Sequence, residues 1–107
     1  MELSVLERLL LINKVLPKHG RYVELILTRE IAGLVDFTEE DVKKFEMSDS
    51  GEGVTWNVEK DVPVKFEFTE SQEDLVRKRL SQMDSEGTLD QDHVSLYRKF
   101  VLTRQDK

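Results

Sequence analysis

Apolar residues near the start of the chain recur at the spacing of an α-helix. They come at intervals of four, three and four, which places them on one helical face: Val5, Leu9, Ile12 and Leu16. Ser4 and Glu7 have the spacing of a capping box, in which each side chain accepts a hydrogen bond from the other residue's backbone N–H. Pro17 cannot continue a helix. The pattern therefore predicts a helix over 5–16 that is buried over much of its girth.

Two further helices are expected before residue 48. The segment 21–35 carries apolar positions at i, i+4, i+7 and i+8, although the apolar residues at 23–27 could equally begin a strand. Those four positions are Leu27, Ile31, Leu34 and Val35. Thr38 followed by Asp41 resembles an N-cap. We expect a helix over 21–35, then a short helix with its apolar face at Val42, Phe45 and Met47, and then a polar loop at 48–53.

The hydrophobic period then changes from about 3.6 to about 2. Apolar residues alternate with other residues at Val54, Trp56 and Val58, and again at Val62, Val64, Phe66 and Phe68. Such alternation is typical of half-buried strands, so the segment predicts a β-hairpin with its turn at 59–61. Pro63 has no backbone donor, which places the start of the second strand at an edge or outside the paired region.

Two helices are expected after the hairpin. Thr69 with Gln72 gives a further capping-box pattern, and the helical stripe continues at Leu75, Val76, Leu80 and Met83. Gly87 fits a helix C-cap, and Asp90 fits the N-cap of the next helix. The inward face of that last helix is expected at Val94, Tyr97, Phe100 and Val101.

The order of elements predicts an α+β fold in a single domain over 1–107, with a frayed tail at 104–107. Three helices precede the β-hairpin and two follow it, which is similar to the order in a winged helix. A two-stranded ribbon is not stable alone, so the hairpin must pack on helices. The predicted core consists of Leu9, Ile12, Leu16, Ile31, Leu34, Phe66, Leu80, Tyr97 and Phe100.

The net charge of −6 lies almost entirely in one segment, 36–61. This segment holds nine acidic and three basic residues, whereas the charges on either side of it nearly cancel. A local negative field attracts basic protein surfaces and repels phosphate within about 8 to 10 Å. The segment therefore favours a basic protein partner over nucleic acid.

Composition narrows the class of protein further. The chain has no cysteine, which excludes disulfides and thiolate chemistry and fits a reducing cytoplasm. Its longest apolar run, 9–12, is far shorter than the roughly 20 residues that span a bilayer. Glu2 and Glu7 stand where a secretory signal would carry a basic leader and a longer apolar stretch. We expect a cytoplasmic protein without a membrane segment.

The segment 84–90 resembles the middle of a calcium-binding helix-loop-helix. Alignment on Gly87 places Gln82 and His93 where that loop needs its two principal carboxylates, so a turn between two capped helices fits better. His19 and His93 lie far apart in the chain without further ligands at helical spacing, and both are expected at the surface. No metal, cofactor or catalytic constellation is predicted, and we expect the protein not to be an enzyme.

The winged-helix-like order raises a second hypothesis, a DNA-binding regulator. In such domains the third helix and the hairpin present Lys and Arg to the duplex. Here the third helix and the predicted turn at 59–61 are acidic, and phosphate would be repelled. The basic cluster at 77–79 follows acids at the spacing of ion pairs and is expected to be a solvated face. The expected pairs are Glu73 with Arg77 and Asp74 with Lys78.

The leading hypothesis is a non-enzymatic binding protein that engages a protein partner through its acidic middle. Trp56 shares a predicted strand face with Val54 and Val58, which favours a core position. The alternative is an exposed aromatic anchor for the partner. The predicted partner-binding residues are Glu39, Glu40, Asp41, Trp56, Glu59 and Asp61. The sequence carries no signal for the oligomeric state.

Four stretches of the chain resemble a group of small proteins encoded by bacteriophages and prophages. They are Leu-Ser-Val-Leu-Glu-Arg-Leu-Leu-Leu-Ile at 3–12, Val15-Leu16-Pro17-Lys18, Phe37-Thr38-Glu39-Glu40-Asp41 and Ser95-Leu96-Tyr97-Arg98-Lys99-Phe100. These motifs are helix caps and core positions, so the resemblance implies a genomic setting and no catalytic residue. It implies that the protein works in the cytoplasm of an infected or lysogenic bacterium, or in the virion. In that setting the accessory protein predicted from the acidic segment would have a basic host or phage protein as its partner.

Overall fold

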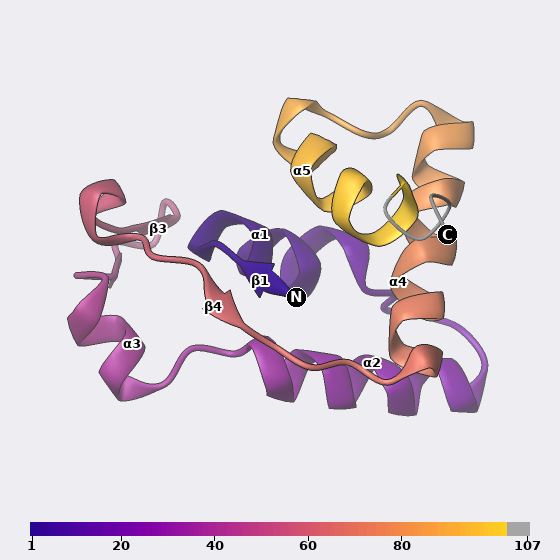
Figure 1. The fold of residues 1–107 in the computed structure, drawn as a ribbon, viewed down its shortest axis with the longest axis horizontal. Coiled ribbons are helices and arrows are strands. Elements are labelled where there is room, and N and C mark those ends of the chain that lie inside the picture. The colour runs from indigo at the N-terminus through magenta and orange to yellow at the C-terminus, as the bar shows by residue number, and fades with distance from the viewer. Residues whose placement is uncertain (103–107) are drawn as a thin grey trace.

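The computed structural model describes residues 1–102 and has the predicted α+β character (Figure 1). The tail predicted at 104–107 lies outside the described residues. The helices are α1 (Val5–Leu10), α2 (Tyr22–Val35), α3 (Glu39–Lys44), α4 (Glu70–Glu86) and α5 (Val94–Tyr97). Short π-helical segments, η1 (Leu11–Val15) and η4 (Arg98–Leu102), extend α1 and α5, and the 3₁₀ turns are η2 (Val58–Lys60) and η3 (Gln91–His93). The strands are β1 (Glu2–Leu3), β2 (Ser48–Asp49), β3 (Val54–Thr55) and β4 (Val64–Lys65).

The predicted helix starts are confirmed by their caps. The side chains of Ser4, Thr38 and Thr69 each accept a hydrogen bond from the backbone N–H three residues on. The side-chain oxygen of that third residue in turn accepts a hydrogen bond from the backbone N–H of the cap residue. Gly87 ends α4 in the left-handed conformation, with φ of 70°, which glycine adopts without a Cβ penalty. Local sequence chemistry therefore determines where these helices begin and where α4 ends.

The core lies where four helical segments meet. In Figure 1, α2 runs along one edge, and α4 rises from it toward the C-terminal helix. The segment α1–η1 packs against both α2 and α4 through η1, and against η3 through α1. The buried cluster consists of Leu3, Leu10, Leu11, Val15, Leu16, Ile31, Val35, Leu75, Val76, Leu80, Leu96, Phe100 and Val101.

The predicted core is confirmed at Leu16, Ile31, Leu80 and Phe100, which are buried. Three further predicted core residues are half-buried and pack against the buried cluster: Ile12, Phe66 and Tyr97. Leu9 is half-buried outside the cluster, and Leu34 is 44% exposed, so its core assignment was wrong. On α2 the inward stripe follows the i, i+4 positions of Ile31 and Val35, which turns Leu34 toward solvent.

The predicted pairing of 54–58 with 62–68 was wrong, although a hairpin does lie between α3 and α4. β3 pairs antiparallel with β2, with Ser48 opposite Thr55. β4 pairs antiparallel with β1, with Leu3 opposite Val64. The residues between β3 and β4 include the 3₁₀ turn η2, so the alternating segment is divided between two small sheets. Alternation identified extended chain, but it carries no information about which strand is the partner.

The basic cluster at 77–79 was expected to be a solvated face, but two of its arginines form hydrogen bonds to neighbouring helical segments. Arg79 Nε donates to the last carbonyl of η1, that of Val15, at 3.1 Å. Arg77 Nε donates to the Phe100 carbonyl within η4 at 3.0 Å. A cation near the C-terminal end of a helix also interacts favourably with the helix dipole. Both arginines are half-buried because they reach across to these carbonyls.

The ion pairs expected on α4 are formed in part. Arg77 lies 3.9 Å from Glu73, as predicted. Asp74 pairs with Arg77 rather than with Lys78. Lys78 instead lies 3.4 Å from Glu24 on α2, because α4 and α2 pack against each other. The packing of two helices thus changed one of the two local pairings.

Leu80→Ala should destabilise the fold by about 2 to 5 kcal/mol, because Leu80 is fully buried and its truncation leaves a cavity. Urea unfolding of the two proteins measures the difference. Leu34→Ala is the matched control on an exposed helix position and should change the unfolding free energy by no more than about 0.5 kcal/mol. Equal losses in the two variants would contradict the assigned burial.

Candidate interaction surface

The acidic segment 36–61 folds into one end of the molecule. In Figure 1 it includes α3, β3 and the turn that follows β3, which lie together at the left, away from α4 and α5. Phe45 is fully buried at this end and does not belong to the buried cluster of the helical core. Its carbonyl accepts a hydrogen bond from the Asn57 backbone N–H at 2.8 Å, which ties the start of η2 to the end of α3. The charge asymmetry along the chain thus becomes an asymmetry in space.

Arg8 joins the acidic end to the helical core. Its side chain is 2% exposed, with Nε donating to the Val35 carbonyl at 2.9 Å and Nη2 donating to the Asp36 carbonyl at 2.8 Å. Nη2 also lies 3.0 Å from Asp41 Oδ2 in an ion pair. Arg8 was not among the predicted site residues. Its signal in the sequence was a cation within the mostly apolar first helix, next to Glu7 and followed by the apolar run 9–12.

Two aromatic rings surround the same guanidinium. Its central carbon lies 4.0 Å from the ring centroid of Phe37 and 5.1 Å from that of Phe66. Both distances are in the range of cation–π attraction, which strengthens where the cation is desolvated. Arg8 therefore contacts the connection from α2 to α3 and the chain after β4 at once.

Two of the predicted partner-binding acids are engaged within the fold. Burial alone would raise the pKa of Asp41, but hydrogen bonds from the Thr38 backbone N–H and from Arg8 outweigh it and lower that pKa. Asp61 Oδ1 accepts a hydrogen bond from the Val5 backbone N–H at 3.1 Å, in the first turn of α1. An N–H in that turn has no partner within the helix. Asp41 and Asp61 thus stabilise the acidic end.

The side-chain carboxylates of four exposed acids at this end have no hydrogen-bond or ion-pair partner among residues 1–102: Glu39, Glu40, Glu52 and Glu59. Glu46 differs from them, since it accepts a hydrogen bond from Asn57 at 3.0 Å and lies 3.5 Å from Lys60. Three of the four unpaired acids are predicted site residues. Their carboxylates are the ones that a cationic partner could reach without breaking an internal contact.

A small apolar hollow opens between α3 and the β2–β3 hairpin. It has a volume of about 240 Å³ and is lined by Val42, Met47, Ser48, Asp49 and Val54. Val42 is 42% exposed although it lies on the predicted apolar face of α3. The hollow was not predicted, because the sequence placed 48–49 in a loop and left the hairpin partner of 54–55 unidentified.

Trp56 is half-buried beside this hairpin and is not part of the main core cluster. Its indole Nε1 is shielded from solvent and has no hydrogen-bond partner among the described residues. The core position expected from a shared strand face was wrong, because Val58 belongs to the turn η2 and is 74% exposed. The fully exposed anchor is not formed either.

A buried carboxylate precedes Arg8 in α1 and contacts the C-terminal segment η4 through Lys99. Glu7 is 3% exposed, and its Oε1 accepts hydrogen bonds from Ser4 N–H at 2.9 Å and from Lys99 Nζ at 2.8 Å. Burial alone would raise the pKa of Glu7, but the hydrogen bonds from Lys99 and Ser4 outweigh it and lower that pKa. Glu7 is therefore an ionised, structural group.

The two histidines differ in their surroundings. His19 is exposed, as predicted, whereas the surface position expected for His93 was wrong because η3 packs against α1 and leaves that side chain 1% exposed. His93 Nδ1 lies 2.8 Å from Asp90 Oδ1, and this hydrogen bond is the largest of the effects that lower the pKa of Asp90. Gly87 and Asp90 act as helix caps, as the predicted turn requires. Within residues 1–102, no group of three His, Asp or Glu side chains could hold a metal ion.

The chain matches no protein-family model, no curated protein and no solved structure. In the described part of the chain, no helix has the length and apolar character needed to cross a membrane.

Glu7→Gln should cost more stability at neutral pH than in acid. Since folding lowers the pKa of Glu7, its ionised form stabilises the fold fully above the ordinary value of 4.5, and this contribution is lost as the pH falls through the lower folded pKa. Urea unfolding across pH should show the difference from wild type shrinking below that value. Glu67→Gln, at an exposed position, should stay within about 0.5 kcal/mol of wild type throughout. A difference for Glu7→Gln that does not change with pH would contradict this assignment.

Proposed function

We propose that the protein is a non-enzymatic binding protein whose acidic end takes a basic segment of a protein partner. The observation that supports this most is that an apolar hollow and the unpaired acids lie at the same end of the molecule. Glu39 lies one helical turn from Val42, which lines the hollow. Asp49 of β2 also lines it, with Oδ1 accepting a hydrogen bond from the Gly51 backbone N–H. Cationic side chains of a partner would meet these acids while one apolar side chain enters the hollow.

The charge and the hollow would act on different steps of binding. Exposed charges mainly speed the encounter, and their effect falls as salt rises. An apolar side chain buried in a hollow mainly slows dissociation. Because the hollow has a volume of only about 240 Å³, we take a single apolar side chain as its occupant. The partner segment is therefore expected to combine several Lys or Arg residues with a single apolar anchor.

The biological setting in this proposal comes from the resemblance to phage and prophage proteins. It predicts an accessory role in an infected or lysogenic bacterium, or in the virion, with a host or phage protein as the source of the basic segment. The residues that carry the resemblance include Phe37 and Asp41, which contact Arg8. Their role is to hold the acidic end, which is consistent with binding at that end.

Two features weigh against the alternative of a DNA-binding regulator. The exposed first turn of α3 carries Glu39 and Glu40, where a recognition helix would present cations. The hairpin between β2 and β3 carries Asp49 and Glu52, which would face phosphate. We therefore propose protein binding alone for this end of the molecule.

The triple reversal Glu39→Lys, Glu40→Lys and Glu59→Lys should slow association with a cationic partner. The probe is a short peptide rich in Lys with a single Leu, and the reporter is the fluorescence of Trp56, the one tryptophan of the chain. Stopped-flow mixing at low salt should show association slowed by about tenfold or more, because attraction is replaced by repulsion. Asp61 is left unchanged because it accepts a hydrogen bond from the Val5 backbone N–H in the first turn of α1.

The matched control reverses three exposed acids elsewhere, Glu2→Lys, Glu67→Lys and Glu86→Lys. It changes the net charge by the same amount and should change the association rate by no more than about twofold, because these charges lie outside the proposed surface. If both triple variants slow association equally, the attraction belongs to the whole molecule, and the proposed surface is wrong.

Val42→Ala tests the apolar hollow separately from the charges. The substitution removes apolar contact of about 1 kcal/mol and should speed dissociation of the same peptide by roughly fivefold. The association rate should stay close to that of wild type. If dissociation is unchanged, or if replacing the peptide's Leu with Gly has no effect on it, the hollow is not the anchor site.

A further inference from the structure

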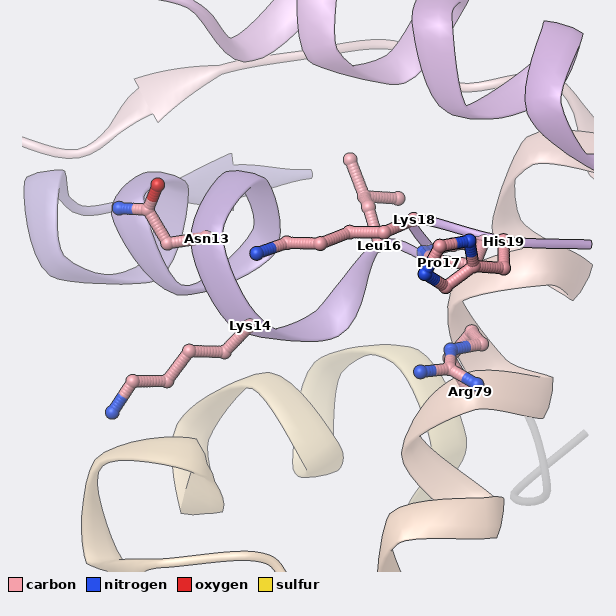
Figure 2. Close-up of a pocket in the computed structure, with 7 residues that line it drawn as sticks. All are labelled: Asn13, Lys14, Leu16, Pro17, Lys18, His19 and Arg79. Atoms are coloured by element: carbon pink, nitrogen blue, oxygen red, sulfur yellow. The ribbon is translucent and has the colours of Figure 1, made fainter.

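A larger hollow lies where η1 ends and α4 passes beside it (Figure 2). Its volume is about 470 Å³, within the range of small-molecule sites. The charged residues that line it within the described chain are all basic, namely Lys14, Lys18 and Arg79. Asn13 and His19 add further polar groups to the lining. In a chain with a net charge of −6, this hollow gathers cations without a single acid in its lining.

The basic side chains come from separate parts of the sequence. Lys14 belongs to η1 and Lys18 to the turn that follows it, whereas Arg79 reaches the hollow from α4, 64 positions after its hydrogen-bond partner Val15. Figure 2 shows Lys18 extended along the hollow in the direction of Asn13, with Arg79 approaching from the neighbouring helix. Only the tertiary fold therefore assembles this group.

The guanidinium of Arg79 is held in place before any ligand binds. Its Nε donates to the Val15 carbonyl at 3.1 Å, and its Nη1 donates to Gln82 at 3.0 Å. Nη2 has no partner among residues 1–102. A planar donor with a fixed orientation and a free N–H pair suits the oxygens of a phosphate group.

The two lysines remain available. Lys18 is exposed and has no partner among the described residues. Lys14 is exposed as well, and its charge is attracted to that of Asp90. Figure 2 shows the Lys14 ammonium directed outward from the rim. Its flexible stem allows it to turn toward an anion in the hollow.

Compensation of the helix dipole accounts for part of this arrangement. Lys14 stands in the last turn of η1, where a cation is favourable. That effect is confined to the last turn, and Lys18 follows after the helix has ended. The size of the hollow and the free Nη2 of Arg79 have no role in dipole compensation. These features favour a ligand.

We propose that this hollow binds a small, multiply charged phosphate compound, with the phosphate oxygens between Arg79, Lys18 and Lys14. Three cations match a ligand with two or more phosphate groups better than a single carboxylate. Leu16 and Pro17 also line the hollow, but both are buried in the fold, so they offer only a small apolar contact beside the cations. A long duplex fits less well, because its phosphates extend past the hollow toward a protein surface that is negative overall.

Titration with sodium pyrophosphate tests the site on the whole chain. Isothermal calorimetry should give a saturable one-site curve, and amide chemical shifts in two-dimensional NMR should change most over 13–20. The double variant Lys14→Gln with Lys18→Gln should weaken the affinity by about tenfold or more. Both positions are exposed, and an unchanged melting curve by circular dichroism will confirm that the variant is folded.

The control is Lys43→Gln with Lys65→Gln, which removes the same charge at two exposed positions outside the hollow. It should leave pyrophosphate affinity within about twofold of wild type. Equal weakening in both variants, or an absence of saturable binding, overturns the proposal.

A parallel titration with a short DNA duplex distinguishes the source of the phosphate. If the duplex binds more tightly than pyrophosphate through the same lysines, a nucleic-acid site replaces the one proposed. Peptide binding at the acidic end is measured separately, so either proposal can fail alone.

Discussion

The buried guanidinium of Arg8 is the interaction on which the arrangement of this fold depends. It binds the carbonyls that end α2, pairs with the carboxylate that caps α3 and lies against the rings of Phe37 and Phe66. A charge removed from water is costly unless such partners surround it, so the protein must keep all these segments together or leave a cation unpaired. Arg8 thereby attaches the acidic end to the helical core, and the hydrogen bond from the Val5 backbone N–H to Asp61 adds a second link.

Charged residues in this molecule serve two purposes that the sequence alone does not separate. Asp41, Asp61 and Glu7 have exchanged hydration for hydrogen bonds inside the fold, whereas Glu39, Glu40 and Glu59 remain free on the surface. The arginines of α4 show the same division, since Arg77 and Arg79 hold carbonyls of other segments while part of Arg79 faces a hollow. The result is an acidic end and a separate cationic hollow on one small domain. The two ligands proposed above, of opposite charge, would therefore not compete for the same residues.

The helices and their caps were predictable because the chemistry that fixes them is local. A capping box needs only two side chains three residues apart, as in Ser4 with Glu7, and a C-cap needs only the freedom of Gly87 to adopt a positive φ. The pairing of the strands was not predictable in the same way. Extended chain with alternating residues can pair with any nearby strand edge. Here β4 pairs with the N-terminal β1, and β3 pairs with β2, whose residues were expected in a loop.

The candidate sites show the same difference between local properties, which the sequence predicts, and contacts between distant residues, which it does not. The sequence by itself determined that the negative charge is gathered in 36–61, that the fold is α+β and where its helices start, because each of these properties depends on composition or on neighbours a few positions apart. Only the tertiary structure decided which of the acids are free, that His93 is buried, and that Arg79 meets Lys14 and Lys18. Those outcomes depend on contacts between residues tens of positions apart. Such contacts are selected by packing and desolvation over the whole molecule, and no local pattern in the chain records them.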